Sequence, residues 1–395
     1  MKTAHASSEP WDEAIVREAI EKICADALAH FDRERLWNAH PSDEWARDGD
    51  TTLYWGATAV IWALDRLRRE GAIGSGGNFA EMLPLLLDRN RTGFAQMIPY
   101  LGMDTSQASF LVGDVGVLLL WMRLAPDAET ADALHARISA NLALPALELM
   151  WGIPGTMLAC KFAHEMTGER RWRQLFLLQA EKLLAELEET PEGPMWTQEL
   201  YLSRFRFLGL VHGLAGNMLA LLSGFEWLDG SRQESIRDAI SRTLTATAVH
   251  GVDGVNWRAD GLVTSEPRLV QICHGAPGMI VAFADERVST PELRALLCEA
   301  GDLVWHTGPL AKGSNLCHGT AGNGYALLKL HALTQDGIWL ERARHFAMSA
   351  IARWRETQAQ HGSGRYSLWT GDAGLAAYLW DCISGEPHFP TLDVF

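Results

Sequence analysis

Two copies of the tripeptide Cys-His-Gly are the residues in this chain best suited to chemistry. One begins at Cys273 in CHGAPG and the other at Cys317 in CHGTAG. Thiolate and imidazole are ligands that zinc prefers, and a catalytic zinc keeps three protein ligands and one open position. Two cysteines and one imidazole would satisfy that pattern. His274 is an alternative fourth ligand, but a catalytic site would keep water at that position.

An internal repeat places the two copies at equivalent points of the chain. The pattern Gly-x-x-Gly opens an apolar stretch six times, and a degenerate copy at Gly56 precedes these. The spacing leaves room for two helices and two loops in each of seven repeats. Equivalent turns of a closed ring point to the same end of its axis, so we expect their side chains to converge. The first glycines of the six full copies are Gly113, Gly152, Gly213, Gly275, Gly319 and Gly371.

Two kinds of helix alternate along the chain. Some segments carry apolar side chains at helical spacing with charges between them, which is typical of helices with one solvent-exposed face. These are residues 11–30, 170–188 and 337–355. Other segments, such as 115–122 and 325–330, are apolar on all sides and predict enclosed helices. The pattern therefore predicts an all-α fold, an α/α toroid of seven helix pairs and about fourteen helices, as a single domain over residues 1–395. Residues 68–80 and 249–268 are expected to be loops.

Charge and cysteine usage exclude several classes of function. The formal charge of −15 disfavours nucleic acid and anionic membranes as partners, and no apolar run approaches the length of a membrane span. We expect a cytoplasmic protein. Six scattered cysteines are too few for a disulfide framework, so those outside the two motifs are expected to pack inside helices. These are Cys24, Cys160, Cys298 and Cys382.

Zinc with an open position predicts a reaction of a thiol. Two thiolates and an imidazole could hold a substrate thiol deprotonated, which produces a nucleophile, and an addition reaction then needs a proton donor. His212 occupies the position before the first glycine of its repeat, as His274 and His318 do, and is the candidate donor. Its alternative role is to tie the turn to a carbonyl group. Lys312, five residues before Cys317, could attract an anionic substrate or could simply be solvated.

The motifs resemble those of the LanC-like proteins, which include lanthipeptide cyclases and eukaryotic relatives. The similar segments are LVQICHGAPG at 269–278, LCHGTAGNGYALL at 316–328, VHGLAG at 211–216 and SLWTGDAG at 367–374. The resemblance implies a seven-fold toroid whose zinc is held by Cys273, Cys317 and His318. It implies addition of a thiol, from a peptide cysteine or from glutathione, to a dehydroalanine or dehydrobutyrine in a peptide or protein.

The resemblance also assigns roles to individual residues. His212 matches the acid of the family, and Glu148 stands where the cyclases have an aspartate, although a carboxylate there could also be a surface charge. The position before the first ligand cysteine, usually tryptophan in the family, is Ile272 here. A lysine before the second ligand cysteine, as Lys312 is here, resembles the glutathione-adding branch more than the peptide cyclases. The oligomeric state is not indicated.

Two other classes of function are consistent with the sequence. A glycan-active toroid would need paired carboxylates at one rim, for which Glu148, Asp114 and Asp372 are candidates, but it leaves the Cys-His-Gly pair unexplained. A zinc-stabilised protein that binds a peptide without turnover would need the zinc ligands but no proton donor.

Overall fold

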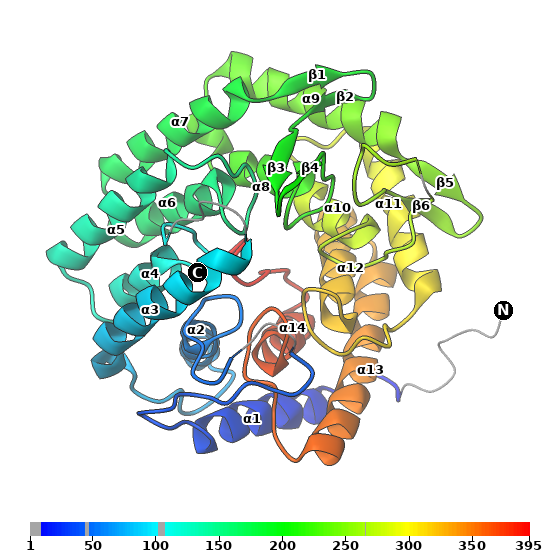
Figure 1. Ribbon diagram of the computed structural model, residues 1–395. Coiled ribbons are helices and arrows are strands. Elements are labelled where there is room, and N and C mark those ends of the chain that lie inside the picture. Colours follow the sequence, from blue (N-terminus) through cyan, green and yellow to red (C-terminus); the bar gives the residue numbers. More distant parts are fainter. Residues whose placement is uncertain (1–8, 44–46, 102–106, 265) are drawn as a thin grey trace. The chain divides into compact units, whose positions relative to one another are not determined.

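The computed structural model describes residues 9–43, 47–101, 107–264 and 266–395. The chain forms two compact units, one from Met1–Arg89 with Gly301–Phe395 and the other from Asn90–Ala300. The first unit contains α1 (Glu13–Ala29), α2 (Ala57–Arg69), the 3-10 helix η1 (Ala80–Met82), α12 (Thr320–Thr334), α13 (Gly337–His361) and α14 (Asp372–Ser384). The second contains α4 (Asp114–Leu124), α5 (Ala128–Asn141), α6 (Ile153–Thr167), α7 (Arg170–Ala185), α8 (Leu214–Ser223), η2 (Phe225–Trp227), α9 (Gly230–Thr247) and α10 (Ala276–Phe283). Helices α3 (Leu83–Leu101) and α11 (Pro291–Thr307) contain residues of both units (Figure 1).

The predicted alternation of wet and enclosed helices is confirmed in each unit. In the second unit α4, α6, α8 and α10 are buried over most of their length, and α6 packs against α7 and α8. In the first unit the enclosed helices α12 and α14 pack against α13 and α1, which expose one face. The apolar stretches are enclosed because removing them from water is the main source of folding free energy. The fourteen α-helices of the described residues match the predicted number.

The repeated glycines begin the enclosed helices, and their small size is required by the turns. A Cβ atom added to Gly213 would lie 2.0 Å from the carbonyl oxygen of Phe207. Gly275 also has a φ of 107°, which strongly favours glycine. The turns therefore bring the chain back on itself within six residues, and the residue before each glycine is fixed beside the helix start. The N-caps are Gly56, Gly113, Gly152, Gly213, Gly275, Gly319 and Gly371.

Three short antiparallel hairpins lie in the second unit, and the sequence analysis did not predict them. They pair β1 (Glu188–Thr190) with β2 (Gly193–Met195), β3 (Gln198–Leu200) with β4 (Ser203–Phe205), and β5 (Val249–Gly251) with β6 (Gly254–Asn256). The predicted loop at 249–268 therefore begins as a hairpin. The alternation of charged and aromatic residues at 204–207 was a usable strand signal.

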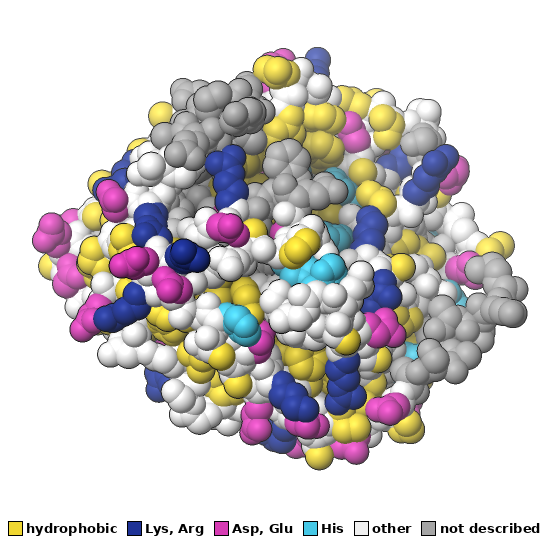
Figure 2. All heavy atoms as spheres, turned by 60° about the horizontal axis from the view of Figure 1, so that its bottom comes forward, with side chains coloured by type: hydrophobic (Ala, Val, Ile, Leu, Met, Phe, Trp, Pro, Cys, Tyr) yellow, Lys and Arg dark blue, Asp and Glu magenta, His cyan; other side chains and the backbone are white. Residues whose placement is uncertain are grey.

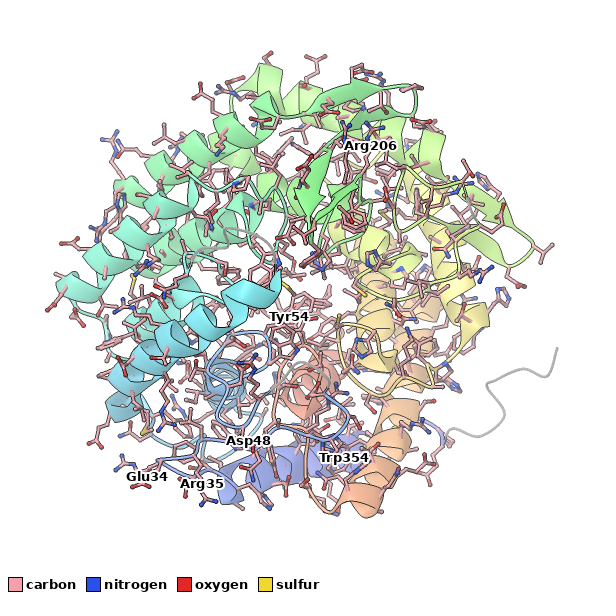
Figure 3. The ribbon with its side chains drawn as sticks, in the orientation of Figure 1. Glu34, Arg35, Asp48, Tyr54, Arg206 and Trp354 are labelled. Atoms are coloured by element: carbon pink, nitrogen blue, oxygen red, sulfur yellow. The ribbon has the colours of Figure 1, made fainter. Side chains whose placement is uncertain are left out.

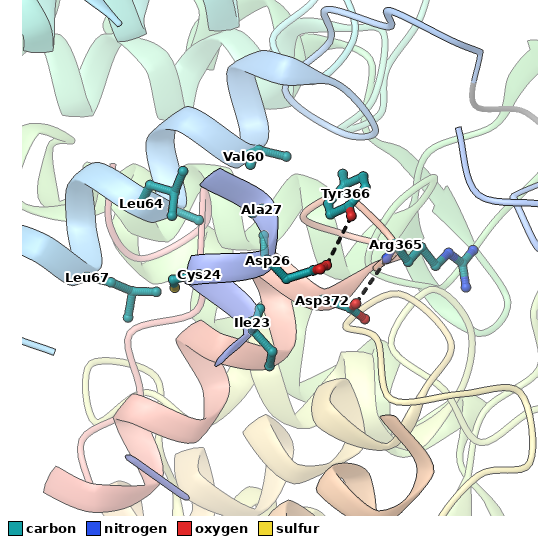
Figure 4. A pocket seen from close by; sticks show the side chains of 12 residues that line it. Ile23, Cys24, Asp26, Ala27, Val60, Leu64, Leu67, Arg365, Tyr366 and Asp372 are labelled. Atoms are coloured by element: carbon teal, nitrogen blue, oxygen red, sulfur yellow. Dashed lines mark hydrogen bonds between the residues drawn. The ribbon is translucent and has the colours of Figure 1, made fainter. Parts of the chain in front are cut away.

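A partly buried polar cluster lies at the start of α14 in the first unit (Figure 4). The Asp372 carboxylate accepts a hydrogen bond of 2.9 Å from the backbone N–H of Arg365, and the Tyr366 hydroxyl donates to Asp26 over 3.0 Å. Burial is the main cause that raises the pKa of Asp372 to about 7. These residues line a small pocket, and Cys24 of α1, which is buried, lines it as well.

The remaining sequence predictions concern the cysteines and the surface. All six cysteines are free, and the four outside the motifs lie in helices as predicted. Lys and Arg side chains are interspersed with Asp and Glu among the side chains drawn in Figure 2. None of the helices in the described part of the chain is both long and apolar enough to cross a membrane.

Candidate functional site

Cys273 lies in a tight turn of the second unit. The backbone groups of Gln271 and His274 exchange two hydrogen bonds of 3.2 Å, which places Cys273 between them. The Gln271 side chain donates from Nε2 to the Cys273 sulfur over 2.8 Å. The Asn256 carboxamide, at the end of β6, accepts from the backbone N–H of Ala276 over 2.8 Å. The end of the β5–β6 hairpin thus supports the turn that presents this sulfur.

The turn that carries His212 packs against the turn that carries Cys273. A Cβ atom added to Gly209 would lie 2.1 Å from the carbonyl oxygen of Cys273. The imidazole rings of His212 and His274 have centroids 6.5 Å apart, and the Phe207 ring lies within 6 Å of both. The expected convergence of equivalent turns is therefore confirmed for these two successive repeats.

Glu148 holds the imidazole of His212. Its Oε2 atom lies 2.7 Å from Nδ1 of His212, and its carboxylate also accepts from the backbone N–H groups of Met150, at 3.1 Å, and Trp151, at 2.5 Å. Glu148 is 0% exposed and lies in a turn before α6, so its interpretation as a surface charge on a helix is wrong. A carboxylate that accepts from Nδ1–H leaves Nε2 as the atom that exchanges protons with a substrate.

The β3–β4 hairpin covers the same dyad. The Gln198 carboxamide donates to the carbonyl oxygen of His212 over 2.8 Å and accepts from the backbone N–H of Leu147 over 3.0 Å. Tyr201, at the tip of the hairpin, presents its ring edge-on to that of His212 with centroids 6.0 Å apart. Neither Gln198 nor Tyr201 was predicted as a site residue, because no strand was expected in this segment.

Cys317 and His318 precede α12 in the first unit. Cys317 is 7% exposed, and its backbone N–H donates to the carbonyl oxygen of Trp369 over 2.8 Å. The backbone N–H of His318 donates to Oδ1 of Asn315 over 3.0 Å. Burial, with the nearby positive charges of Arg365 and Lys312, lowers the pKa of His318 to about 4. Its imidazole is therefore neutral at neutral pH, the form that offers a lone pair to a metal.

A cavity of about 410 Å³ adjoins this turn, and Lys312 is among its lining residues. Asn315 and Arg365 line it as well, and Arg365 is paired with Asp43. Nδ2 of Asn315 and Nε of Arg365 are buried donors without a hydrogen-bond partner among the described residues.

The predicted zinc ligands come from both units. Cys273 belongs to the second unit, whereas Cys317 and His318 belong to the first. Among the described residues, neither unit by itself gathers three or more Cys, His, Asp or Glu side chains into a metal cluster. Because the ligands are expected from both units, the zinc site stays a prediction.

The carboxylates proposed for a glycan-active enzyme have other partners. Glu148 holds His212, and Asp114, which is fully buried, forms ion pairs with Arg91 at 2.9 Å and Arg137 at 3.1 Å. Asp372 lies in the partly buried cluster at the start of α14, where it accepts from the backbone N–H of Arg365. Each of these carboxylates therefore has a local structural role that a glycosidase acid would not need.

Comparisons with known proteins identify the family. The family described as "Lanthionine synthetase C-like protein" matches residues 106–394. A glutathione S-transferase LANCL1 from Danio rerio is 27% identical over 318 residues, which cover 72% of this chain and 74% of that protein. The LanC-like protein GCL1 from Arabidopsis thaliana is 32% identical over 199 residues, which cover 48% of this chain and 44% of that protein.

A solved structure supports the fold. A nisin cyclase superposes with a TM-score of 0.53 and 14% identity, covering 85% of this chain and 94% of its own. That likeness concerns the fold alone, and it agrees with the predicted α/α toroid of helix pairs. On the family match, the chain belongs to the lanthionine synthetase C-like family.

Proposed function

We propose that this protein catalyses the addition of a thiol to a dehydroalanine or dehydrobutyrine residue in a peptide or protein, forming a thioether with the help of zinc. The observation that carries the proposal is the buried Glu148 carboxylate bonded to His212, in a turn packed against Cys273. A carboxylate, an imidazole and a soft sulfur ligand in adjoining turns suit a reaction that needs a proton donor beside a metal.

In this proposal Cys273, Cys317 and His318 would hold the zinc ion, because two thiolates and one imidazole are ligand types that zinc prefers. The Cys273 sulfur accepts an N–H hydrogen bond from Gln271, which fixes its orientation in the turn. Cys317 and His318 are consecutive residues of a turn whose backbone is fixed by Asn315 and Trp369. When bound, zinc would lower the pKa of a substrate thiol so that it is a thiolate at neutral pH.

His212 would supply the proton that completes the addition. When a thiolate sulfur attacks the β-carbon, the electron pair of the carbon–carbon double bond moves toward the carbonyl group and leaves an enolate. The protonated imidazole of His212 gives a proton from Nε2 to the α-carbon, and Glu148 stabilises the imidazolium form until then. The proton lost by the thiol restores the imidazolium through solvent, so one S–H adds across one double bond.

The cavity beside Cys317 favours a thiol that carries carboxylates. Lys312 lines it, and its positive charge would attract a carboxylate. Glutathione has two carboxylates, and the LANCL1 relative bears the name glutathione S-transferase. We therefore propose glutathione as the intermolecular thiol, with a peptide cysteine as the alternative.

The test is to incubate the zinc-loaded protein with a peptide that contains both dehydroalanine and cysteine, with and without glutathione. Mass spectrometry reports a gain of one glutathione, and alkylation of the remaining thiol reports ring closure without a change of mass. A glutathione adduct that forms faster with the protein than without it supports the proposal, and closure alone supports the peptide thiol. Tight peptide binding without any product would instead favour the non-catalytic alternative.

A further inference from the structure

Tyr201 is held beside the imidazole of His212 by an unusual backbone. It occupies the tip of the β3–β4 hairpin with Leu202, and their φ angles are 51° and 62°. Positive φ is uncommon for residues other than glycine, and bulky residues adopt it only where the surroundings impose it. Leu202 is 85% exposed, whereas the Tyr201 side chain turns back toward the dyad.

One turn of the chain orients both the imidazole and the phenol. Residues 148–151 hold His212 through the Glu148 carboxylate, and they hold Tyr201 through the indole of Trp151. The carboxylate and the indole are themselves linked, because Glu148 accepts from the backbone N–H of Trp151. The hairpin is fixed from its other end by Gln198, which bonds to the His212 carbonyl oxygen.

Arg206, labelled in Figure 3, also fixes the hairpin. It follows β4, its backbone N–H donates to Asp260 over 3.0 Å, and its guanidinium donates to Thr197, just before β3, over 3.0 Å. The tip therefore projects from a hairpin that is braced at its base on both strands.

The Tyr201 hydroxyl keeps its own proton for another partner. The indole N–H of Trp151 can only donate, so the Tyr201 oxygen accepts that 2.9 Å hydrogen bond. The hydroxyl proton has no acceptor among the residues that the structure describes. A hydroxyl that accepts one hydrogen bond becomes a better donor in a second one. Burial, with the negative charge of Glu148, raises the pKa of Tyr201, so the hydroxyl stays protonated throughout the physiological range.

We propose that Tyr201 is a catalytic residue whose hydroxyl donates a hydrogen bond to the carbonyl oxygen of the dehydroamino acid. This inference rests on the function proposed above. As the carbon–sulfur bond forms, that oxygen gains the negative charge of the enolate, and a donor placed in advance stabilises it. Tyr201 keeps its proton, while His212 supplies the one that ends on the α-carbon. Tyr201 thus stabilises the oxygen of the enolate, and His212 protonates its α-carbon.

The test compares Tyr201→Phe with Leu202→Ser at the same hairpin tip. Removal of one such donor typically lowers kcat by about 10²-fold, and we expect kcat and kcat/KM of Tyr201→Phe to fall together. Leu202→Ser should keep the wild-type rate. If the wild type forms no thioether, the proposed function fails. If the wild type is active and Tyr201→Phe retains more than half of its kcat, this inference alone fails.

A second variant separates hydrogen bonding from packing. Replacing Tyr201 with 3,5-difluorotyrosine keeps its ring and hydroxyl but makes the phenol more acidic. The groups facing it are Glu148, His212 and the Trp151 indole. At a pH where the fluorinated phenol stays protonated, the account predicts that kcat remains close to the wild-type value, because the hydrogen-bond donor is retained. A fall of about 10²-fold in the folded, zinc-loaded protein would overturn the donor role even if Tyr201→Phe were unfolded.

Discussion

Replacing Glu148 with glutamine removes the charge that holds His212 while nearly preserving shape. In the native turn the carboxylate accepts from Nδ1 of His212 and from the backbone N–H groups of Met150 and Trp151. Trp151 donates to Oε1, whereas Met150 and Nδ1 of His212 both contact Oε2. A glutamine whose carbonyl oxygen keeps the Trp151 bond therefore places its NH₂ group against Nδ1 and against the Met150 N–H. Nδ1 must then become an acceptor, which disfavours an imidazolium that is protonated on both nitrogens.

The size of the effect follows from the bond that is lost. A hydrogen bond to a charged group contributes about 1.5–3 kcal/mol. At about 1.4 kcal/mol for each factor of ten in rate, the loss of that hydrogen bond corresponds to a factor of roughly 10 to 100. We expect kcat for thioether formation to fall by about that factor. Bound zinc should stay unchanged, because Glu148 is not among the predicted ligands.

The assay is the initial rate of thioether formation followed by mass spectrometry, with zinc measured by elemental analysis on the same samples. The control is Glu199→Gln on strand β3, which removes an exposed carboxylate from the same part of the unit. A wild-type kcat in Glu148→Gln would refute the reasoning that this carboxylate sustains the acid. A loss of zinc in that variant would show that the turn serves the metal instead.

Three further predictions concern packing, pH and the metal. Gly324→Ala should destabilise the fold by about 1–3 kcal/mol in a denaturant titration, because its Cβ would lie 1.9 Å from the Tyr378 hydroxyl oxygen, whereas Gly337→Ala, with nothing within 4 Å, should not. Burial raises the pKa of Asp372 from 3.8 to about 7, so the folded state keeps a proton that the unfolded state has lost, and stability should fall as pH rises from about 4 to 7. Asp372→Asn should make that fall in stability smaller. If the free energy of unfolding changed equally with pH in both proteins, Asp372 would not be the group responsible. Cys317→Ala should abolish zinc binding and activity together, while His212→Ala should keep zinc and lose turnover. If Cys317→Ala bound as much zinc as the wild type, Cys317 would not be a zinc ligand.

The helical part of the fold was predictable because helices are specified locally. The alternation of half-charged and wholly apolar segments identified wet and enclosed helices, and α7 and α13 begin within a residue of the predicted start. The glycine at each enclosed N-terminus was equally visible, because a turn that leaves no room for a Cβ atom repeats in every copy.

The parts of the site that depend on tertiary contacts were not predictable. A carboxylate four residues before a glycine carries no mark of burial, yet Glu148 is fully buried because three donors converge on it. Tyr201 lies at the tip of a hairpin of three-residue strands, and although the alternation at 204–207 marks the second strand, nothing in the sequence places the tip beside His212. The contacts of Gln198 with two separate turns likewise appear only when the chain is folded.

The most direct test of the central claim is zinc K-edge X-ray absorption on the protein as purified and after addition of glutathione. With Cys273, Cys317 and His318 as ligands, the spectrum should contain two sulfur neighbours and at least one nitrogen, and glutathione should add a third sulfur. A spectrum without sulfur neighbours, or a protein that binds no zinc at all, would contradict the account.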